Sequence, residues 1–111
     1  MRSKPEIEAI LQESFSDPGS EESGEYLLEH VLRDARMLTH EDRPGLVGVL
    51  GDWIRIRSRP WTTLALRVVG ELKLTELRTD IQRLREDVLA GTAFTHNYLS
   101  IIDMALSDLA G

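Results

Sequence analysis

The sequence predicts an all-α fold of about six antiparallel helices, arranged as a short helical-repeat stack or an irregular bundle. Leucine is the commonest apolar residue, with 17 copies against 13 for valine and isoleucine together, which disfavours a β-sheet. Apolar residues recur at helical spacing in every long segment, and none alternates with a period of two for long. With 111 residues, of which 41% are hydrophobic, the chain suits a single domain over residues 1–111.

The first helix is expected to begin near Ser3. Ser3 and Glu6 have the spacing of a capping box, in which the serine hydroxyl accepts a hydrogen bond from the main chain three residues later. Pro5 suits a first helical turn. Turn-forming residues then end the helix, and residues 16–24 are expected to form a flexible acidic loop.

A second helix is expected over residues 25–38, and a third one after a break before Pro44. Proline suits the opening turn of a helix and disrupts its interior, so the third helix begins close to Pro44. Three glycines in it lie at a spacing of three residues. They indicate close helix packing, because the strand and the Lys-Ser/Thr ending of a phosphate-binding loop are both missing. These are Gly45, Gly48 and Gly51.

The second half of the chain contains the clearest periodic pattern. A helix follows Pro60, and after a short link an apolar stripe repeats at helical spacing. The stripe consists of Leu77, Ile81, Leu84 and Val88. Gly91 is a candidate C-cap, and the last helix is expected from about Phe94.

Residues 59–90 resemble a HEAT-type helical repeat. In such repeats a proline opens the first helix, an alanine and a glycine permit close packing, and a second amphipathic helix folds back. Pro60, Ala65 and Gly70 occupy those places. The resemblance implies a helical hairpin in a stack with a binding face and without enzymatic activity.

The net charge of −6 is unevenly distributed. Eight acidic residues and no Lys or Arg lie between Glu6 and Glu29, whereas residues 55–85 hold eight bases and three acids. Such a chain repels nucleic acid over most of its surface and attracts basic partners. We therefore predict a docking surface for a basic protein, and the alternative is a merely solvated helix face and loop. The candidate residues are Asp17, Glu21, Glu22, Glu25 and Glu29.

A second candidate partner site lies between the two tryptophans, where arginines alternate with other residues. Its members are Arg55, Arg57, Arg59 and Trp61. Arginine and tryptophan often anchor protein interfaces, and they can also contact phosphates and stack on bases. The net negative charge favours a protein partner over nucleic acid. A purely structural role, with buried tryptophans and arginines near a helix C-terminus, is the other interpretation.

The residues that most enzymes and metal sites need do not form a pattern in this sequence. There is no cysteine, and His30, His40 and His96 have none of the spacings of a histidine metal motif. We expect no catalytic residues, no metal and no cofactor. With no long apolar run, no membrane span is expected either, and a cytoplasmic location is the default.

Size, acidity and the absence of cysteine resemble those of small bacterial immunity proteins, which block a cognate toxin such as a nuclease. The likeness is one of class. It implies a non-catalytic inhibitor that covers a basic toxin domain, with charge attraction speeding association. A helical-repeat scaffold or adaptor is the runner-up, followed by a nucleic-acid-binding module that uses Arg55 to Trp61 or a small enzyme.

Overall fold

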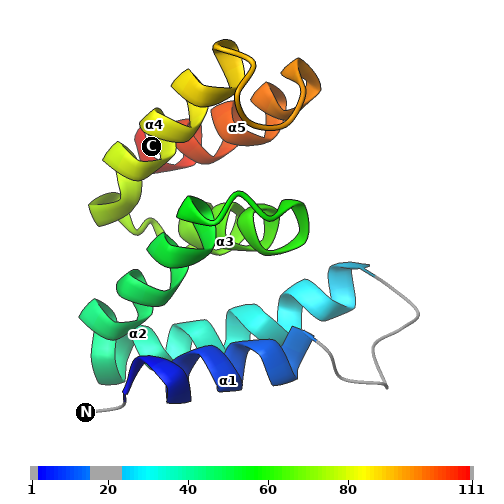
Figure 1. Ribbon diagram of the computed structural model, residues 1–111. Coiled ribbons are helices and arrows are strands. Elements are labelled where there is room, and N and C mark those ends of the chain that lie inside the picture. The colour runs from blue at the N-terminus through cyan, green and yellow to red at the C-terminus, as the bar shows by residue number, and fades with distance from the viewer. Residues whose placement is uncertain (1–2, 16–23, 111) are drawn as a thin grey trace. The chain divides into compact units, whose positions relative to one another are not determined.

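A computed structural model describes residues 3–15 and 24–110, including all side chains in these ranges except those of residue 15 and residues 24–28. Within them the chain forms α-helices and short 3₁₀ turns and no strand, so the all-α prediction is confirmed (Figure 1). In chain order the elements are α1 (Lys4–Phe15), α2 (Gly24–Arg55), α3 (Arg59–Leu72), η2 (Thr75–Leu77), α4 (Arg78–Leu89), η3 (His96–Tyr98) and α5 (Leu99–Ala110).

The chain divides into two compact units, residues 1–49 and residues 50–111. Helix α2 contributes to both of them. In the first unit, α1 lies alongside the first part of α2 (Figure 1). Ile7 and Leu11 of α1 are completely buried, as the apolar spacing of this helix predicts.

Short polar contacts fix both ends of α1. The main-chain N–H of Glu6 donates to the Ser3 hydroxyl at 3.3 Å, which confirms Ser3 as the N-cap. Near the other end of the helix, the Ser14 hydroxyl donates to the carboxylate of Asp34 on α2. The first helix therefore begins where its capping residues predict, and a side-chain bond ties its last turn to α2.

The helices expected on either side of the 39–44 segment are two parts of one kinked helix, so the described chain has five α-helices rather than six. The kink lies at Asp42, whose backbone is extended (φ −157°, ψ 72°). Its side chain accepts a hydrogen bond from the Gly45 N–H at 3.2 Å and so caps the second part of α2. Pro44 lies in the opening turn of that part, as predicted. The second part begins directly after the kink at Asp42, so no loop separates two helices.

In the second unit, α3 and α4 each pack mainly against α5 (Figure 1). Helices α3 and α5 run in the same direction. The Thr63 and Tyr98 hydroxyls hydrogen-bond at 2.7 Å near their first turns, and the Lys73 ammonium donates to the Asp108 carbonyl near their ends. Helix α4 runs antiparallel to α5. The three helices therefore alternate in direction along the chain, but α3 packs mainly on α5 and not on α4, so the HEAT-like hairpin over residues 59–90 is not confirmed.

The predicted apolar stripe of α4 is confirmed. Leu77, Ile81, Leu84 and Val88 are all buried. On the other side of the helix, Arg78 and Gln82 are exposed and Arg85 is partly exposed. This agrees with an amphipathic helix that packs one face on α5.

The last helix begins at Leu99, later than the sequence predicts. Gly91 follows the C-cap Ala90 of α4 with a left-handed backbone (φ 79°), which is the place where glycine commonly stops a helix. Phe94 is also left-handed (φ 53°), a conformation that cannot continue into an α-helix. A 3₁₀ turn at His96–Tyr98 therefore comes first, and α5 follows it.

Candidate protein-binding surfaces

The predicted acidic docking surface lies almost entirely outside the described residues. Asp17, Glu21 and Glu22 are outside them, and so is the side chain of Glu25, whose backbone belongs to α2. Glu29 is described and is exposed on α2. The structure therefore places one of the five side chains on a surface and does not bring the set together.

The charges are divided between the two units. By sequence, residues 1–49 contain 11 acidic and five basic residues, whereas residues 50–111 contain eight of each. The first unit therefore carries the whole net charge of −6. Exposed acids within its described part include Glu6 and Glu13 of α1 and Glu29 of α2.

In the basic candidate site, Arg55 is bound to carboxylates of its own unit. Its guanidinium donates to Asp52 at 2.5 Å and to Asp80 at 3.3 Å. The hydrogen bond with Asp52 is the main cause that raises the pKa of Arg55 above its ordinary value; burial opposes it, and the negative charges of Asp80 and Asp52 add to it. An arginine that is held by two carboxylates is poorly placed to bind a phosphate.

Arg57 and Arg59 are engaged in different ways. Arg57 lies two residues beyond the end of α2 and has a left-handed backbone (φ 55°). Its guanidinium donates to the Ile54 carbonyl at 2.8 Å and to Asp87 at 2.6 Å. Arg59 is exposed, and its guanidinium lies 5.9 Å from the centre of the Tyr98 ring, within the range of a cation–π contact. Of the three arginines, only Arg59 is free of carboxylate partners among the described residues.

The two tryptophans form a pair whose members differ in exposure. Trp53 is buried, with 3% of its surface exposed, while Trp61 is partly exposed. Their ring centres lie 4.9 Å apart with the planes tilted by 44°, a favourable aromatic geometry. Trp53 is therefore part of the core, and Trp61 and Arg59 are what remain of the predicted basic site at the surface.

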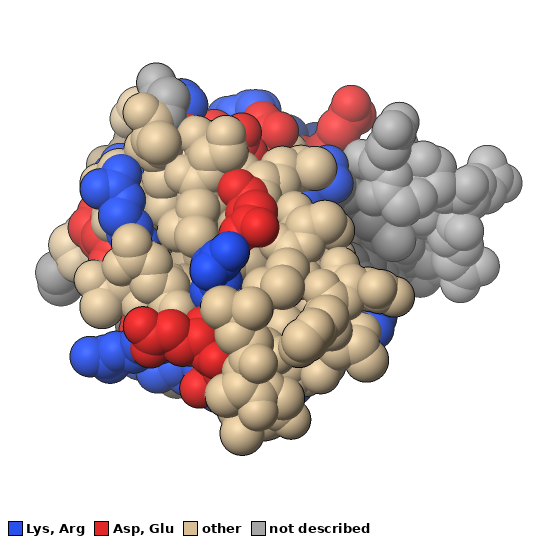
Figure 2. Space-filling view, turned by 90° about the horizontal axis from the view of Figure 1, so that it is seen from above, with Lys and Arg blue, Asp and Glu red and all other residues tan. Residues whose placement is uncertain are grey.

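The second unit also has an uncharged surface that was not among the predicted sites. Residues 88–102 contain no Asp, Glu, Lys or Arg in a chain that is 29% charged. Much of this segment is exposed, including Leu89 at 49%. Seen from above, in Figure 2, charged side chains form small mixed groups and leave a broad area with neither sign. Depletion of charge is typical of the centre of a protein interface, and the gap between Asp87 and Asp103 could have revealed it.

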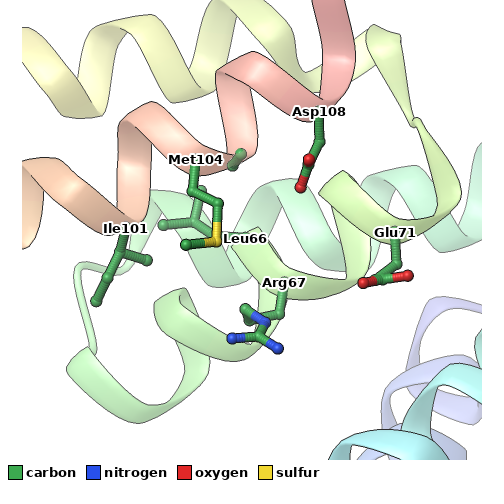
Figure 3. A pocket seen from close by; sticks show the side chains of 7 residues that line it. Leu66, Arg67, Glu71, Ile101, Met104 and Asp108 are labelled. Carbon is green, nitrogen blue, oxygen red and sulfur yellow. The ribbon is translucent and has the colours of Figure 1, made fainter. Parts of the chain in front are cut away.

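A shallow groove lies between α3 and α5 in the same unit, with a volume of about 60 Å³ (Figure 3). Apolar side chains line it from both helices, and Met104 is 56% exposed. Three charged residues line it as well. The complete lining is Leu66, Arg67, Glu71, Ile101, Met104, Ala105 and Asp108.

Gly70 allows α5 to approach α3 at the acidic end of this groove. A Cβ atom at Gly70 would lie 2.8 Å from the Asp108 carboxylate oxygen and 3.4 Å from the Asp108 Cβ. The HEAT resemblance implies close helix packing at Gly70, and a helix does approach closely there. The helix that it admits is α5, not α4.

No group of three His, Asp or Glu side chains suited to a metal ion occurs within residues 3–15 and 24–110. In the same part of the chain, no helix is long and apolar enough to cross a membrane. Comparisons of the sequence and the structure with protein-family models, curated proteins and solved structures find no match.

Proposed function

We propose that this chain is a non-catalytic protein-binding domain, an immunity-type inhibitor that covers a basic toxin domain such as a nuclease in the bacterial cytoplasm. The chain's negative charge, concentrated in residues 1–49, would draw the basic partner in, and Glu29 is the described member of that surface. Charges of this kind act mainly on the rate of encounter.

The observation that carries the proposal is the internal neutralisation of the second unit. Ion pairs join Arg55 to Asp80, Arg57 to Asp87 and Arg85 to Asp103. Two further cations, Lys73 and Arg78, donate to main-chain carbonyls near the end of α5. The basic stretch therefore offers few cations to nucleic acid. The first unit contains more acidic than basic residues, so its own bases cannot neutralise it.

A helical-repeat scaffold or adaptor is the second candidate. The parallel packing of α3 and α5 favours it, because corresponding helices of stacked repeats run in the same direction. Its partner would contact Arg59 and Trp61, the exposed remainder of the Arg55–Trp61 site.

The test begins with the genome. The proposal requires a gene for a basic, toxin-like protein immediately upstream, and the product of that gene is the partner for kinetic measurements. Reversing Glu21, Glu22, Glu25 and Glu29 to Lys should slow association far more than it speeds dissociation. Raising the salt concentration from about 0.05 to 0.5 M should shrink that difference, because the screening length falls below the ~10 Å of 0.1 M salt.

Single exposed residues provide the matched control. Glu29→Lys should slow association more than Glu86→Lys, which makes the same charge change on α4 of the neutral unit. An association rate that the fourfold reversal leaves unchanged would overturn the acidic docking surface. If Trp61→Ala weakens binding while the glutamate variants keep their rates, the adaptor site is the correct one.

A further inference from the structure

The groove between α3 and α5 collects charged side chains that have no partner among the described residues. Five charged side chains within the described residues 50–110 make no ion pair, hydrogen bond or ring contact with another described residue. Arg67, Glu71 and Asp108 line the groove, and the other two, Arg83 and Glu86, lie on α4. Most other charges in the described part of this unit are paired internally, and three of the five unpaired ones gather at the groove.

The acidic side chains are not spread evenly along the groove. Glu71 and Asp108 lie toward one end of the groove, and Ile101 lies at the other end (Figure 3). In the same view, Arg67 extends from α3 in the direction away from α5. The floor between the two ends is apolar, since Leu66 and Ala105 are buried beneath the exposed Met104.

The size of the groove limits its occupant to a single side chain. Its volume of about 60 Å³ is far below the roughly 300–1,000 Å³ of sites for cofactors and drug-sized ligands. Ile101 belongs both to the groove and to the uncharged segment 88–102. A partner that inserts one side chain here can therefore continue onto a surface with the low charge of an interface centre.

We infer that this groove receives one Lys or Arg side chain of a basic protein partner. The aliphatic part of that side chain lies along Leu66, Ala105 and Met104, and its cationic end reaches Glu71 and Asp108. Long basic side chains bury their methylene groups in this way while the charged end stays in water. The flexible thioether of Met104 adjusts to the guest. The inference rests on the proposed function, because it assigns the contact by which a basic partner is anchored.

Arg67 gives the site its selectivity. Arg67 and Glu71 both lie on α3 and both line the groove. The positive charge of Arg67 repels a second cation, so the end with the two carboxylates accepts one basic side chain. Removing this charge should therefore strengthen binding of a cation. Removing Glu71 and Asp108 should weaken it, by an amount typical of exposed ion pairs.

The experiment uses small molecules that reproduce a lysine side chain and need no known partner. The 111-residue chain is titrated with n-butylammonium, 1-butanol and butyrate while carbon-13 NMR follows the ε-methyl group of Met104. The methyl of Met37, on the first unit, is the internal reference. We expect a saturable shift of Met104 alone, with n-butylammonium binding about threefold more tightly than 1-butanol and butyrate most weakly.

Variants that replace a charged side chain with a neutral one show which residues cause the preference for n-butylammonium. Glu71→Gln combined with Asp108→Asn should abolish the preference for n-butylammonium, and Arg67→Gln should increase it. Glu86→Gln, the matched loss of an exposed and unengaged carboxylate on α4, should leave it unchanged. Equal binding of 1-butanol, no shift at Met104, or the same loss in Glu86→Gln would each overturn the inference.

Failure of this experiment is separable from failure of the proposed function. If the groove does not select a cation while the glutamate variants still slow association with the toxin, the groove is wrong and the inhibitor proposal stands. If the groove selects a cation and the upstream product does not bind, the inhibitor proposal is wrong and the groove remains a pocket for a basic side chain.

Discussion

The hydroxyl of Thr62 donates a hydrogen bond of 2.7 Å to the main-chain carbonyl of Trp53, and both residues are buried. Carbonyls in the last turn of a helix lack the usual partner four residues later. Here the Arg57 N–H, which stands in that position, donates instead to the Ile54 carbonyl at 3.4 Å. A side chain at the start of α3 thus donates the hydrogen bond that a main-chain carbonyl at the end of α2 would otherwise lack, across the link that contains Ser58.

Thr62→Val tests this bond, because it keeps the shape of the side chain and removes the donor. The Trp53 carbonyl would be left buried without that partner, at a cost of about 1–3 kcal/mol in the free energy of unfolding. Thr62→Ser keeps the hydroxyl and should cost clearly less. Urea denaturation of the two variants measures the difference, and equal losses would show that packing and not the hydrogen bond matters.

Gly45 and Gly48 should respond in opposite directions to substitution by alanine. A Cβ at Gly45 would lie 2.5 Å from the Asp42 carboxylate and 2.6 Å from the end of the Ile7 side chain, so Gly45→Ala must displace the helix cap or the core. We expect a loss of about 1–3 kcal/mol. A Cβ at Gly48 meets only the flexible Lys4 side chain, at 3.1 Å.

Gly48→Ala should therefore be neutral or should stabilise the protein by up to ~1 kcal/mol, because alanine is the better helix former. The pair is compared by thermal and urea unfolding. If Gly45→Ala stabilises as much as Gly48→Ala does, the close approach of α1 and α2 at Gly45 is incorrect.

Ile81 lies at the centre of the α4 stripe and is completely buried. Ile81→Ala should reduce the free energy of unfolding by about 2–5 kcal/mol, through lost burial and the cavity left behind. The neighbouring Gln82 is exposed, and Gln82→Ala should change stability by less than about 0.5 kcal/mol. A similarly small effect at Ile81 would mean that this face is open to solvent.

Tyr98 should ionise at a higher pH than an exposed tyrosine. Burial raises the pKa of Tyr98, and the hydrogen bond with Thr63 and the charge of Arg59 only partly oppose this. The neutral phenol is therefore favoured in the folded state. Stability from this group is fully present below the unfolded pKa of about 10 and is lost as the pH rises above that value.

Tyrosinate absorbance gives the measurement. A Tyr26→Phe variant leaves Tyr98 as the single tyrosine, so its titration is read directly. Thr63→Val should raise the pKa further, since it removes a hydrogen bond that favours the ionised form. Titration of Tyr98 at about pH 10 in the folded protein would show that the phenol is not buried.

The positions of the helices follow from the sequence because they depend on neighbours within one or two turns. The cap at Ser3, Pro44 in an opening helical turn, the stripe around Ile81 and the glycine that follows α4 are all local signals, and the structure confirms each of them. The stop expected before Pro44 is only a kink at Asp42 within α2. A repeat of 3.6 residues in the apolar pattern fixes which face of a helix is buried. It leaves open which helix covers that face.

Only the tertiary structure decided the helix pairings and, with them, the nature of the basic site. Arg57 meets Asp87 thirty residues later, and this depends on where α4 lies relative to the end of α2. The left-handed residues Lys73 and Phe94 help to redirect the chain on either side of α4, so α5 and not α4 covers α3. Such turns are set by packing between distant segments. The sequence alone therefore revealed the charge excess and the periodic stripes, while the neutralised arginines and the groove depend on how those distant helices meet.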